Sequence, residues 1–251
     1  MSGMFERTLK QKLANRERLV GTWSVIPSPV VADAIAENLD FVIIDMEHGP
    51  ITFETAQNML IALRGQDCHG MIRIPDYAES NILKAFDIGA EGIIVPQIEH
   101  HHALWDIASR SKYPPLGRRG LSPYTRAGQY GSRKEHLRKS NEETVTSVII
   151  ENKNALDALE IIVKDKVVDL LYFGIYDISL ALGHPGDISH KDVRDTIEQG
   201  IRLAADAGIS VGGFVHNKEE MNMYGNMGMN FFAYGVDAYI LQKGYDGLQG
   251  H

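Results

Sequence analysis

The sequence predicts an α/β fold, a (β/α)8 TIM barrel with an N-terminal helix that caps its base. Eight short apolar runs alternate with segments of helical periodicity, which is typical of such barrels. The 251 residues suit one barrel, and no linker-like shift in composition divides them. A doubly wound open sheet is the alternative, but no Gly-x-Gly-x-x-Gly turn follows the first strand. We therefore expect a single domain over residues 1–251.

The order of the expected elements follows from periodicity and from Gly, Pro and polar residues at their ends. Phe5, Leu9 and Leu13 recur at helical spacing and predict the opening helix. Strands are expected at 19–26, 41–44, 71–74, 93–95, 146–150, 170–174, 210–215 and 231–236. Helices are expected at 30–38, 53–63, 81–88, 101–111, 155–163 and 193–207. Gly89 takes the position of a C-terminal cap after the third of these helices.

A long segment from Lys112 to Asn141 separates the fourth strand from the fifth. Segments of this length inside compact domains are usually functional lids or disordered loops. It carries Arg118, Arg119, Tyr124, Arg126, Tyr130 and Arg133. A lid-like loop at about 112–141 that faces an anion is one interpretation, and a solvated charged loop is the other.

Composition narrows the partners and the compartment. A formal net charge of -8 and a pI near 5.7 argue against binding to nucleic acid or to an anionic membrane. A single cysteine, Cys68, cannot form an internal disulfide, which fits a reducing compartment. No apolar run approaches the roughly 20 residues that span a bilayer, and the first residues lack the apolar stretch of a signal peptide. We expect a cytoplasmic protein.

Polar side chains follow most of the predicted strands. Because the carboxyl ends of parallel strands meet at one rim of a barrel, these side chains are expected to gather there. They are Trp23, Asp45, Glu47, His48, Arg73, Gln97, Glu99, Glu151, Asp177, His216 and Asp237. For one isolated strand, exposed polar ends are the simpler explanation, and it is the recurrence along the chain that indicates a site.

The residue types at this rim indicate enolate chemistry beside a carbonyl group. Glu151 and Asp177 follow neighbouring strands and offer oxygen ligands to a divalent cation such as Mg²⁺ or Mn²⁺. Arg73 offers a planar fork of donors for a carboxylate or a developing oxyanion. Histidine is a common general base, so His48 is a candidate base, and Asp45 is expected to fix its tautomer and raise its basicity. A cation, a guanidinium and a base around one cavity are what such chemistry requires.

Longer motifs then resemble a known family. They are Asp45-Met-Glu-His-Gly49, Arg73-Ile-Pro75 with Asn81, Phe86-Asp-Ile-Gly-Ala-Glu-Gly-Ile-Ile-Val-Pro96, Pro114-Pro-Leu-Gly-Arg-Arg-Gly120, Arg126-Ala127 with Tyr130-Gly131, Glu151-Asn152, Asp177-Ile-Ser179 and Gly235-Val-Asp237. In this order and spacing they resemble the class II pyruvate aldolases of the HpcH/HpaI family, relatives of citrate lyase β subunits. The resemblance runs from about Trp23 to Asp237.

The resemblance implies a metal-dependent barrel that forms or cleaves carbon–carbon bonds between a pyruvate-type ketoacid and an aldehyde. The implied cofactor is a divalent ion, with Mg²⁺ or Mn²⁺ favoured and Co²⁺ or Zn²⁺ as further candidates. The implied assembly is a homo-oligomer, a trimer or a hexamer, in which the family's last helix is exchanged between subunits. Here only Ala238–His251 follow the last strand, which is shorter than in the family.

The resemblance also implies roles for single residues. Glu151 and Asp177 match the metal ligands, and Arg73 matches the arginine that binds pyruvate and stabilises its enolate. His48 matches the catalytic base, and Asp45 matches the partner of that base. Three further matches carry lesser expectations: Trp23 as a lining residue, Asp87 as a family aspartate or a structural cap, and Glu47 as a supporting group or a structural ion pair. Tyr176 departs from the family and is expected to be a substrate-binding residue.

Two departures at the site bear on the ketoacid. The family usually has Gln where this chain has Ile149, and Pro with a small residue where it has Ile175 and Tyr176. Tyr176 is expected to narrow the pocket that holds the small end of the ketoacid. A citrate-lyase-like acyl-CoA lyase is one alternative, which the acidic balance and the lack of an evident adenine-phosphate patch disfavour. A non-catalytic ketoacid-binding barrel is the other, and Ile149 and Tyr176 are the only features that favour it. A Schiff-base aldolase is disfavoured because no buried strand contains a lysine.

Overall fold

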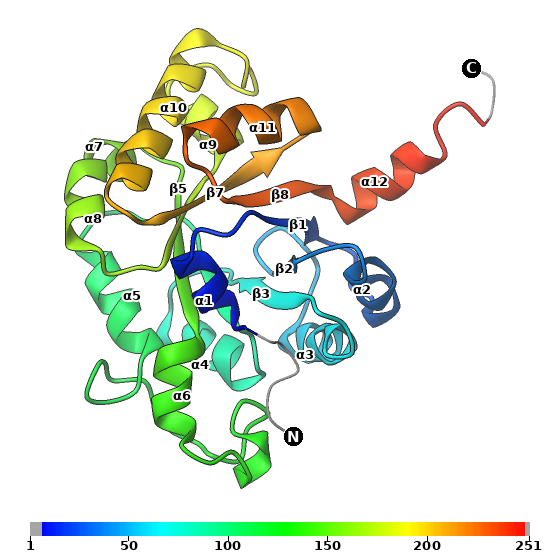
Figure 1. Ribbon diagram of the computed structural model, residues 1–251, viewed down its shortest axis with the longest axis vertical. Coiled ribbons are helices and arrows are strands. Elements are labelled where there is room, and N and C mark those ends of the chain that lie inside the picture. The colour runs from blue at the N-terminus through cyan, green and yellow to red at the C-terminus, as the bar shows by residue number, and fades with distance from the viewer. Residues whose placement is uncertain (1–6, 249–251) are drawn as a thin grey trace.

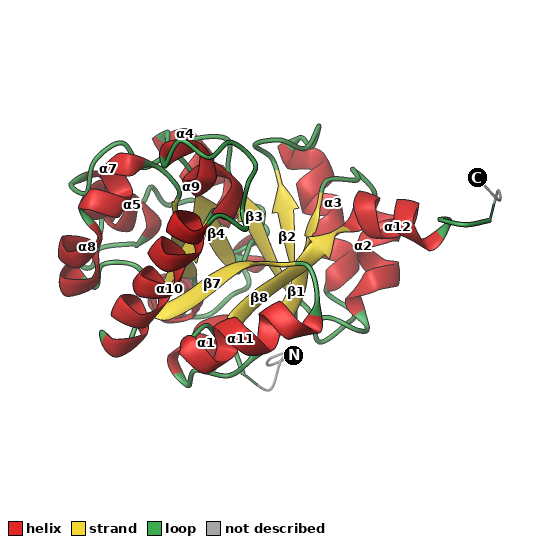
Figure 2. Ribbon diagram, turned by 90° about the horizontal axis from the view of Figure 1, so that it is seen from above, coloured by secondary structure: helices red, strands yellow, loops and turns green. Residues whose placement is uncertain are grey.

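A computed structural model, which describes residues 7–248, contains a closed barrel of eight parallel strands (Figures 1 and 2). The strands follow one another around the barrel in chain order, and the last pairs with the first. They are β1 Leu19–Ser24, β2 Phe41–Asp45, β3 His69–Arg73, β4 Gly92–Val95, β5 Val145–Ile150, β6 Leu170–Phe173, β7 Ser210–Val215 and β8 Phe231–Val236. The predicted fold class and all eight predicted strands are confirmed.

Helices surround the barrel in the described part of the chain (Figure 2). They are α1 Leu9–Ala14, α2 Pro29–Ala36, α3 Phe53–Leu63, α4 Glu79–Asp87, α5 Ala103–Ser111, α6 His136–Glu143, α7 Lys153–Asp157, α8 Leu159–Asp165, α9 Ile175–Ala181, α10 Lys191–Asp206, α11 Lys218–Met227 and α12 Asp237–Gly244, with a 3-10 turn at Gln129–Gly131. The single helix predicted at 155–163 is instead the pair α7 and α8, and α6 lies in the long segment. None of the described helices is both long and apolar enough to cross a bilayer.

Short polar side chains begin several of these helices. Ser28 accepts a hydrogen bond from the Val31 amide at the start of α2, and Pro29 takes the first helical position. Asn217 caps α11 in the same way by accepting from the Glu220 amide at 2.8 Å. Each such cap stabilises its helix by about 1 kcal/mol, so the rim from which the helices start is held in a fixed shape.

The barrel interior has its own apolar core, separate from the layer between strands and helices. Alternate strand residues point inward, and Phe41 and Phe231 stack across the interior with ring centroids 3.7 Å apart. Leu9 and Leu13 of α1 belong to this inner core, and the Ser210 hydroxyl donates to the Leu13 carbonyl at 2.9 Å. The predicted helix that caps the base is therefore present, while Phe5, predicted to be part of it, lies outside the described residues.

Much of the long segment at 112–141 lies near the base of the barrel, where the strands begin, although Arg118 reaches Glu79 in the first turn of α4. Its Lys112 ammonium donates to the Thr144 carbonyl at 2.8 Å, beside the start of β5. Arg119 pairs with Asp87 at 2.7 Å at the end of α4. The contacts of Lys112 and Arg119 lie at the amino-terminal rim because the segment joins a helix to the next strand. The lid-like role of the loop stays a prediction.

Candidate active site

The polar residues at the carboxyl rim continue the inward-facing positions of the strands. Asp45 follows the inner-core residue Ile43 by two positions, and Glu151 follows Ile149 in the same way. The register of β2 and β3 places Asp45 directly beside Arg73. These side chains therefore form a layer above the apolar core of the barrel, where TIM barrels carry their active sites.

Arg73 and Asp45 form a buried ion pair with two parallel hydrogen bonds. Arg73 Nε donates to Asp45 Oδ1 at 2.8 Å, and Nη2 donates to Oδ2 at 2.5 Å. The third nitrogen, Nη1, lies 3.0 Å from Glu47 Oε2. Burial lowers the pKa of Arg73, but its hydrogen bond to Asp45 and the charges of Asp45 and Glu47 outweigh this, so the pKa lies above its ordinary value. The guanidinium is therefore a fixed positive charge at the centre of the rim.

Trp23 lies beneath this guanidinium. Its ring faces Arg73 with 4.5 Å between the guanidinium carbon and the ring centroid. Its indole Nε1 donates to the Tyr172 hydroxyl at 2.8 Å, and the two rings meet edge to face. Burial raises the pKa of Tyr172, so its hydroxyl stays protonated. The sequence pointed to Trp23 but not to Tyr172, which lies inside an apolar strand pattern.

Glu151 is a buried carboxylate of the rim, with 7% of its surface exposed. Its Oε1 accepts a hydrogen bond from the Gln97 amide at 2.5 Å, and the Gln97 side chain donates to Glu47 Oε1 at 2.8 Å. Burial raises the pKa of Glu151 to about 7; the charges of Asp177 and Glu47 add to this rise, and the Gln97 hydrogen bond and Arg73 oppose it. Gly174 beside it leaves room, since a Cβ there would lie 3.0 Å from Glu151 Cβ.

Glu151 and Asp177 are the two predicted ligands of a divalent cation, and carboxylate oxygens of this kind suit such an ion. Asp177 lies exposed in the first turn of α9, close enough for its charge to raise the pKa of Glu151. A buried carboxylate beside further carboxylates is unfavourable without a positive charge, and a bound cation would reverse that balance. Their oxygen atoms are the ligands that Mg²⁺ and Mn²⁺ prefer.

His48 lies exposed in the turn after β2. Asp45 Oδ1 accepts hydrogen bonds from the backbone amides of Glu47 at 3.0 Å and of His48 at 3.3 Å. The imidazole ring itself has no hydrogen-bond partner among residues 7–248. Asp45 was expected to hold the His48 ring, but its carboxylate oxygens bind Arg73 and this turn instead. The role of His48 as a base stays a prediction.

Three other rim residues, Tyr176, His216 and Asp237, have partners that the sequence did not indicate. The Tyr176 hydroxyl lies 2.9 Å from His216 Nε2, and His216 Nδ1 lies 2.9 Å from Glu220 Oε2. The Asp237 carboxylate accepts a hydrogen bond from the Ser24 hydroxyl at 2.7 Å and others from the backbone that follows β1. Asp237 therefore ties the end of β8 to the chain that follows β1.

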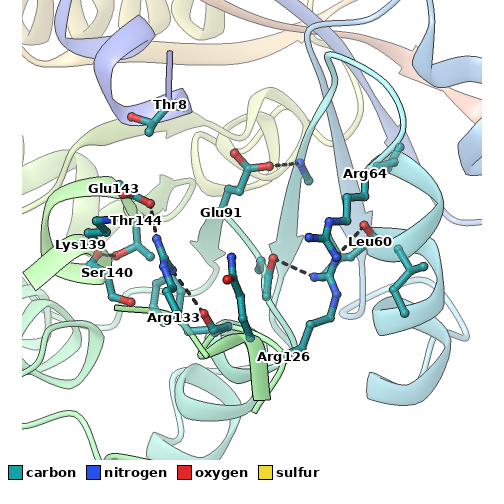
Figure 3. Close-up of a pocket in the computed structure, with 18 of the residues that line it drawn as sticks. Thr8, Leu60, Arg64, Glu91, Arg126, Arg133, Lys139, Ser140, Glu143 and Thr144 are labelled. Carbon is teal, nitrogen blue, oxygen red and sulfur yellow. Dashed lines mark hydrogen bonds and ion pairs between the residues drawn. The ribbon is translucent and has the colours of Figure 1, made fainter. Parts of the chain in front are cut away.

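A cavity of about 1040 Å³ lies at the opposite rim, among the long segment, α3, α4 and α6 (Figure 3). Arg126 donates to the carbonyls of Leu60, Ile88 and Gly89 at its edge, and Arg133 pairs with Glu143. These arginines hold loops together. None of the predicted site residues lines this cavity.

Comparisons with known proteins find relatives that match this chain over most of its length. The hydroxypyruvate/pyruvate aldolase of Roseovarius nubinhibens is 30% identical over 94% of this chain and 93% of its own length. The 2-keto-3-deoxy-L-rhamnonate aldolase of Klebsiella pneumoniae is 29% identical over 98% of this chain and 93% of its own. A crystal structure of an HpcH/HpaI aldolase/citrate lyase family protein from Burkholderia cenocepacia superimposes with a TM-score of 0.91 at 28% identity, covering 96% of this chain and 97% of the other.

The sequence pattern of one family also matches most of the chain, from residue 21 to residue 243. The matched range contains every strand of the barrel except the first two residues of β1. It also contains the Asp45–Arg73 ion pair and the carboxylates of Glu151 and Asp177. The chain therefore belongs to the HpcH/HpaI aldolase/citrate lyase family.

Proposed function

We propose that this aldolase of the HpcH/HpaI family uses a divalent cation to cleave or form 2-oxo-4-hydroxy acids from a pyruvate-type ketoacid and an aldehyde. Glu151 and Asp177 hold the cation, with Mg²⁺ or Mn²⁺ favoured and Co²⁺ or Zn²⁺ as further candidates. The observation that carries the proposal is Glu151, a buried carboxyl whose pKa is raised to about 7 beside two further carboxylates. The aldolase names of the relatives support the substrate class.

Arg73 binds the ketoacid end of the substrate. Its two hydrogen bonds to Asp45 leave N–H groups on both terminal nitrogens, which suit a carboxylate or carbonyl oxygen. Asp45 and the ring of Trp23 fix the guanidinium in place, so little entropy is lost when substrate binds. The cation, when bound, supplies Lewis-acid polarisation of the ketoacid carbonyl.

His48 acts as the general base of cleavage. Its ring is exposed and has no partner among the described side chains, which leaves a nitrogen free to accept a proton. His48 takes the proton from the 4-hydroxyl group, the bond between C3 and C4 breaks, and the aldehyde departs. Arg73 stabilises the negative charge that develops on the enolate oxygen, and protonation at C3 then gives the ketoacid.

The protein also assembles as a homo-oligomer, a trimer or a hexamer, in the cytoplasm. Helix α12 projects away from the barrel (Figures 1 and 2). It exposes the apolar side chains of Tyr239, Ile240 and Leu241, and Tyr245 and Leu248 after it are exposed as well. A projecting apolar surface of this kind supports contact with another copy.

The test is an activity screen of pyruvate with a panel of aldehydes, run with Mn²⁺, with Mg²⁺ and after treatment with a chelator. We expect carbon–carbon bond formation that is lost with the chelator and restored by added metal. Full activity in the chelator would exclude the cation from the mechanism. No turnover with any aldehyde would favour the non-catalytic ketoacid-binding barrel.

A further inference from the structure

The rim between β6 and β7 carries a second polar network, made of Tyr176, His216 and Glu220 and called here the Tyr176 network. Tyr176 lies in the first turn of α9, His216 directly follows β7, and Glu220 lies in the first turn of α11. Hydrogen bonds of 2.9 Å join Tyr176 to His216 and His216 to Glu220. The network therefore connects three separate elements at the rim that carries Glu151 and Asp177.

The partners fix the direction of each hydrogen bond. A carboxylate only accepts hydrogen bonds, so the neutral His216 ring carries its proton on Nδ1, facing Glu220. His216 Nε2 is then an acceptor, and the Tyr176 hydroxyl donates to it. Glu220 Oε2 also accepts a hydrogen bond from the His216 backbone amide at 2.8 Å. Glu220 therefore holds both the backbone and the ring of His216. The Tyr176 oxygen is left with free lone pairs and no free proton.

The Tyr176 ring is held in place at the open rim. The ring of Phe214 lies 6.1 Å from that of Tyr176 and 4.9 Å from that of His216. Tyr176 is nevertheless 48% exposed, and it directly precedes Asp177 in the chain. The exposed tyrosine therefore offers a fixed hydrogen-bond acceptor at the rim that also carries Glu151 and Asp177.

We propose that Tyr176, positioned by His216 and Glu220, selects substrates that carry an alcohol hydroxyl group. A substrate hydroxyl can donate a hydrogen bond to the Tyr176 oxygen, whereas a methyl group of the same size leaves that acceptor unpaired. The hydroxyl belongs either to the ketoacid, at C3, or to the aldehyde, at the carbon beside its carbonyl. This inference rests on the proposed aldolase function and names the substrate feature that the site prefers.

Two isosteric pairs separate the two sources of the hydroxyl group. Hydroxypyruvate is compared with 2-oxobutanoate as the ketoacid, and glycolaldehyde is compared with propanal as the aldehyde. The readout is the ratio of kcat/KM between the hydroxylated member and its isostere. In Tyr176→Phe we expect this ratio to fall about 3- to 10-fold for one pair, the effect of one lost hydrogen bond. The pair that responds identifies the source.

The positioning residues are tested by the same ratio. His216→Ala should lower it in the same pair, because the Tyr176 hydroxyl is then no longer held. Glu220→Gln keeps an acceptor for His216 Nδ1 and should keep more of the ratio than Glu220→Ala. Tyr245→Phe, the same substitution at an exposed position beyond α12, is the matched control and should keep the wild-type ratio.

Three results would overturn the inference. In the first, Tyr176→Phe leaves both kcat/KM ratios at their wild-type values. The substitution would then affect the hydroxylated substrate and its isostere equally. In the second, Tyr245→Phe lowers a ratio as much as Tyr176→Phe does. In the third, wild-type protein turns over no ketoacid with any aldehyde, so the proposed function fails and the inference fails with it.

Discussion

The two rims of the barrel both hold half-buried arginines, but they hold them in different ways. At the carboxyl rim, carboxylates surround Arg73, and its pKa is raised although burial opposes this. At the base, the backbone carbonyls of Leu60, Ile88 and Gly89 surround Arg126. Burial, followed by the charge of Arg64, lowers the pKa of Arg126.

The difference separates a reactive rim from an architectural one. Around Arg73 the carboxylates of Asp45, Glu47 and Glu151 exceed the positive charge, which leaves room for one more cation. The hydrogen-bond acceptors around Arg126 are neutral backbone carbonyls at the ends of α3 and α4. Arg126 therefore connects these two helix ends and has no carboxylate partner among these contacts. Both rims carry charged groups, and at the carboxyl rim the carboxylates near Arg73 outnumber its single positive charge.

Removing a cation ligand should give the largest effect. Glu151→Ala or Asp177→Ala is expected to abolish binding of Mn²⁺ and the activity with it, since each supplies oxygen to the proposed site. Calorimetric titration with Mn²⁺ and circular dichroism of each variant are the measurements. Glu143→Ala at the base, which loses its contact with Arg133, is the matched control and should bind Mn²⁺ normally. Undiminished binding in both rim variants would place the cation elsewhere.

Replacing the base should give the next largest effect. His48→Ala is expected to slow turnover by about 10²- to 10⁴-fold, the range of general acid–base catalysis, with a nearly unchanged KM. Arg73→Lys should instead weaken ketoacid binding and turnover together, because lysine lacks the two-donor fork. Steady-state kinetics and oxalate affinity distinguish the two. If His48→Ala keeps full turnover, the base lies elsewhere.

At the base of the barrel, Arg126→Lys is the counterpart of Arg73→Lys, and it should affect the stability of the fold and not the turnover. Arg126→Lys keeps the charge but loses contacts with several carbonyls, and we expect a loss of roughly 2 kcal/mol in the free energy of unfolding. Turnover per folded molecule should stay at the wild-type level. Urea unfolding and kcat are the measurements. A large fall in kcat without a loss of stability would show that the two rims do not divide their roles in this way.

The smallest expected effect is a dependence on pH. Because the pKa of Glu151 is raised to about 7, a proton competes with the cation below that pH. The affinity for Mn²⁺ should fall about tenfold per pH unit below 7 and level off above it. Without a cation, the stability of the fold should change with pH in the opposite direction to the Mn²⁺ affinity. The folded state binds the Glu151 proton more tightly than the unfolded state does, so the free energy of unfolding falls as pH rises from 4.5 to about 7. Titrations between pH 5.5 and 8.5 test both, and a flat affinity would contradict the assignment.

The fold and most rim positions were predictable because they depend only on the periodicity of apolar residues and on the order of strands and helices along the chain. Glu151 and Asp177 follow buried strands, and that position by itself assigns them to the carboxyl rim. The partner of Asp45 was not predictable, because it depends on the register of β2 against β3, which places Arg73 opposite. Tyr172 and Glu220 were missed because each lies within an ordinary strand or helix pattern. The placement of residues 112–141 was available from topology, since a helix-to-strand connection belongs at the base.

Gln97 has a consequence for protein engineering. It is a non-glycine residue with a φ of +54°, a left-handed backbone that costs roughly 1 kcal/mol or more. Substitution by glycine would relieve this strain and would be chosen by any method that optimises stability alone. It would also delete the side chain that links Glu47 to the backbone donor of Glu151. A thermostabilised version of this enzyme should therefore keep its glutamine, and a library that selects only for heat resistance is expected to lose it.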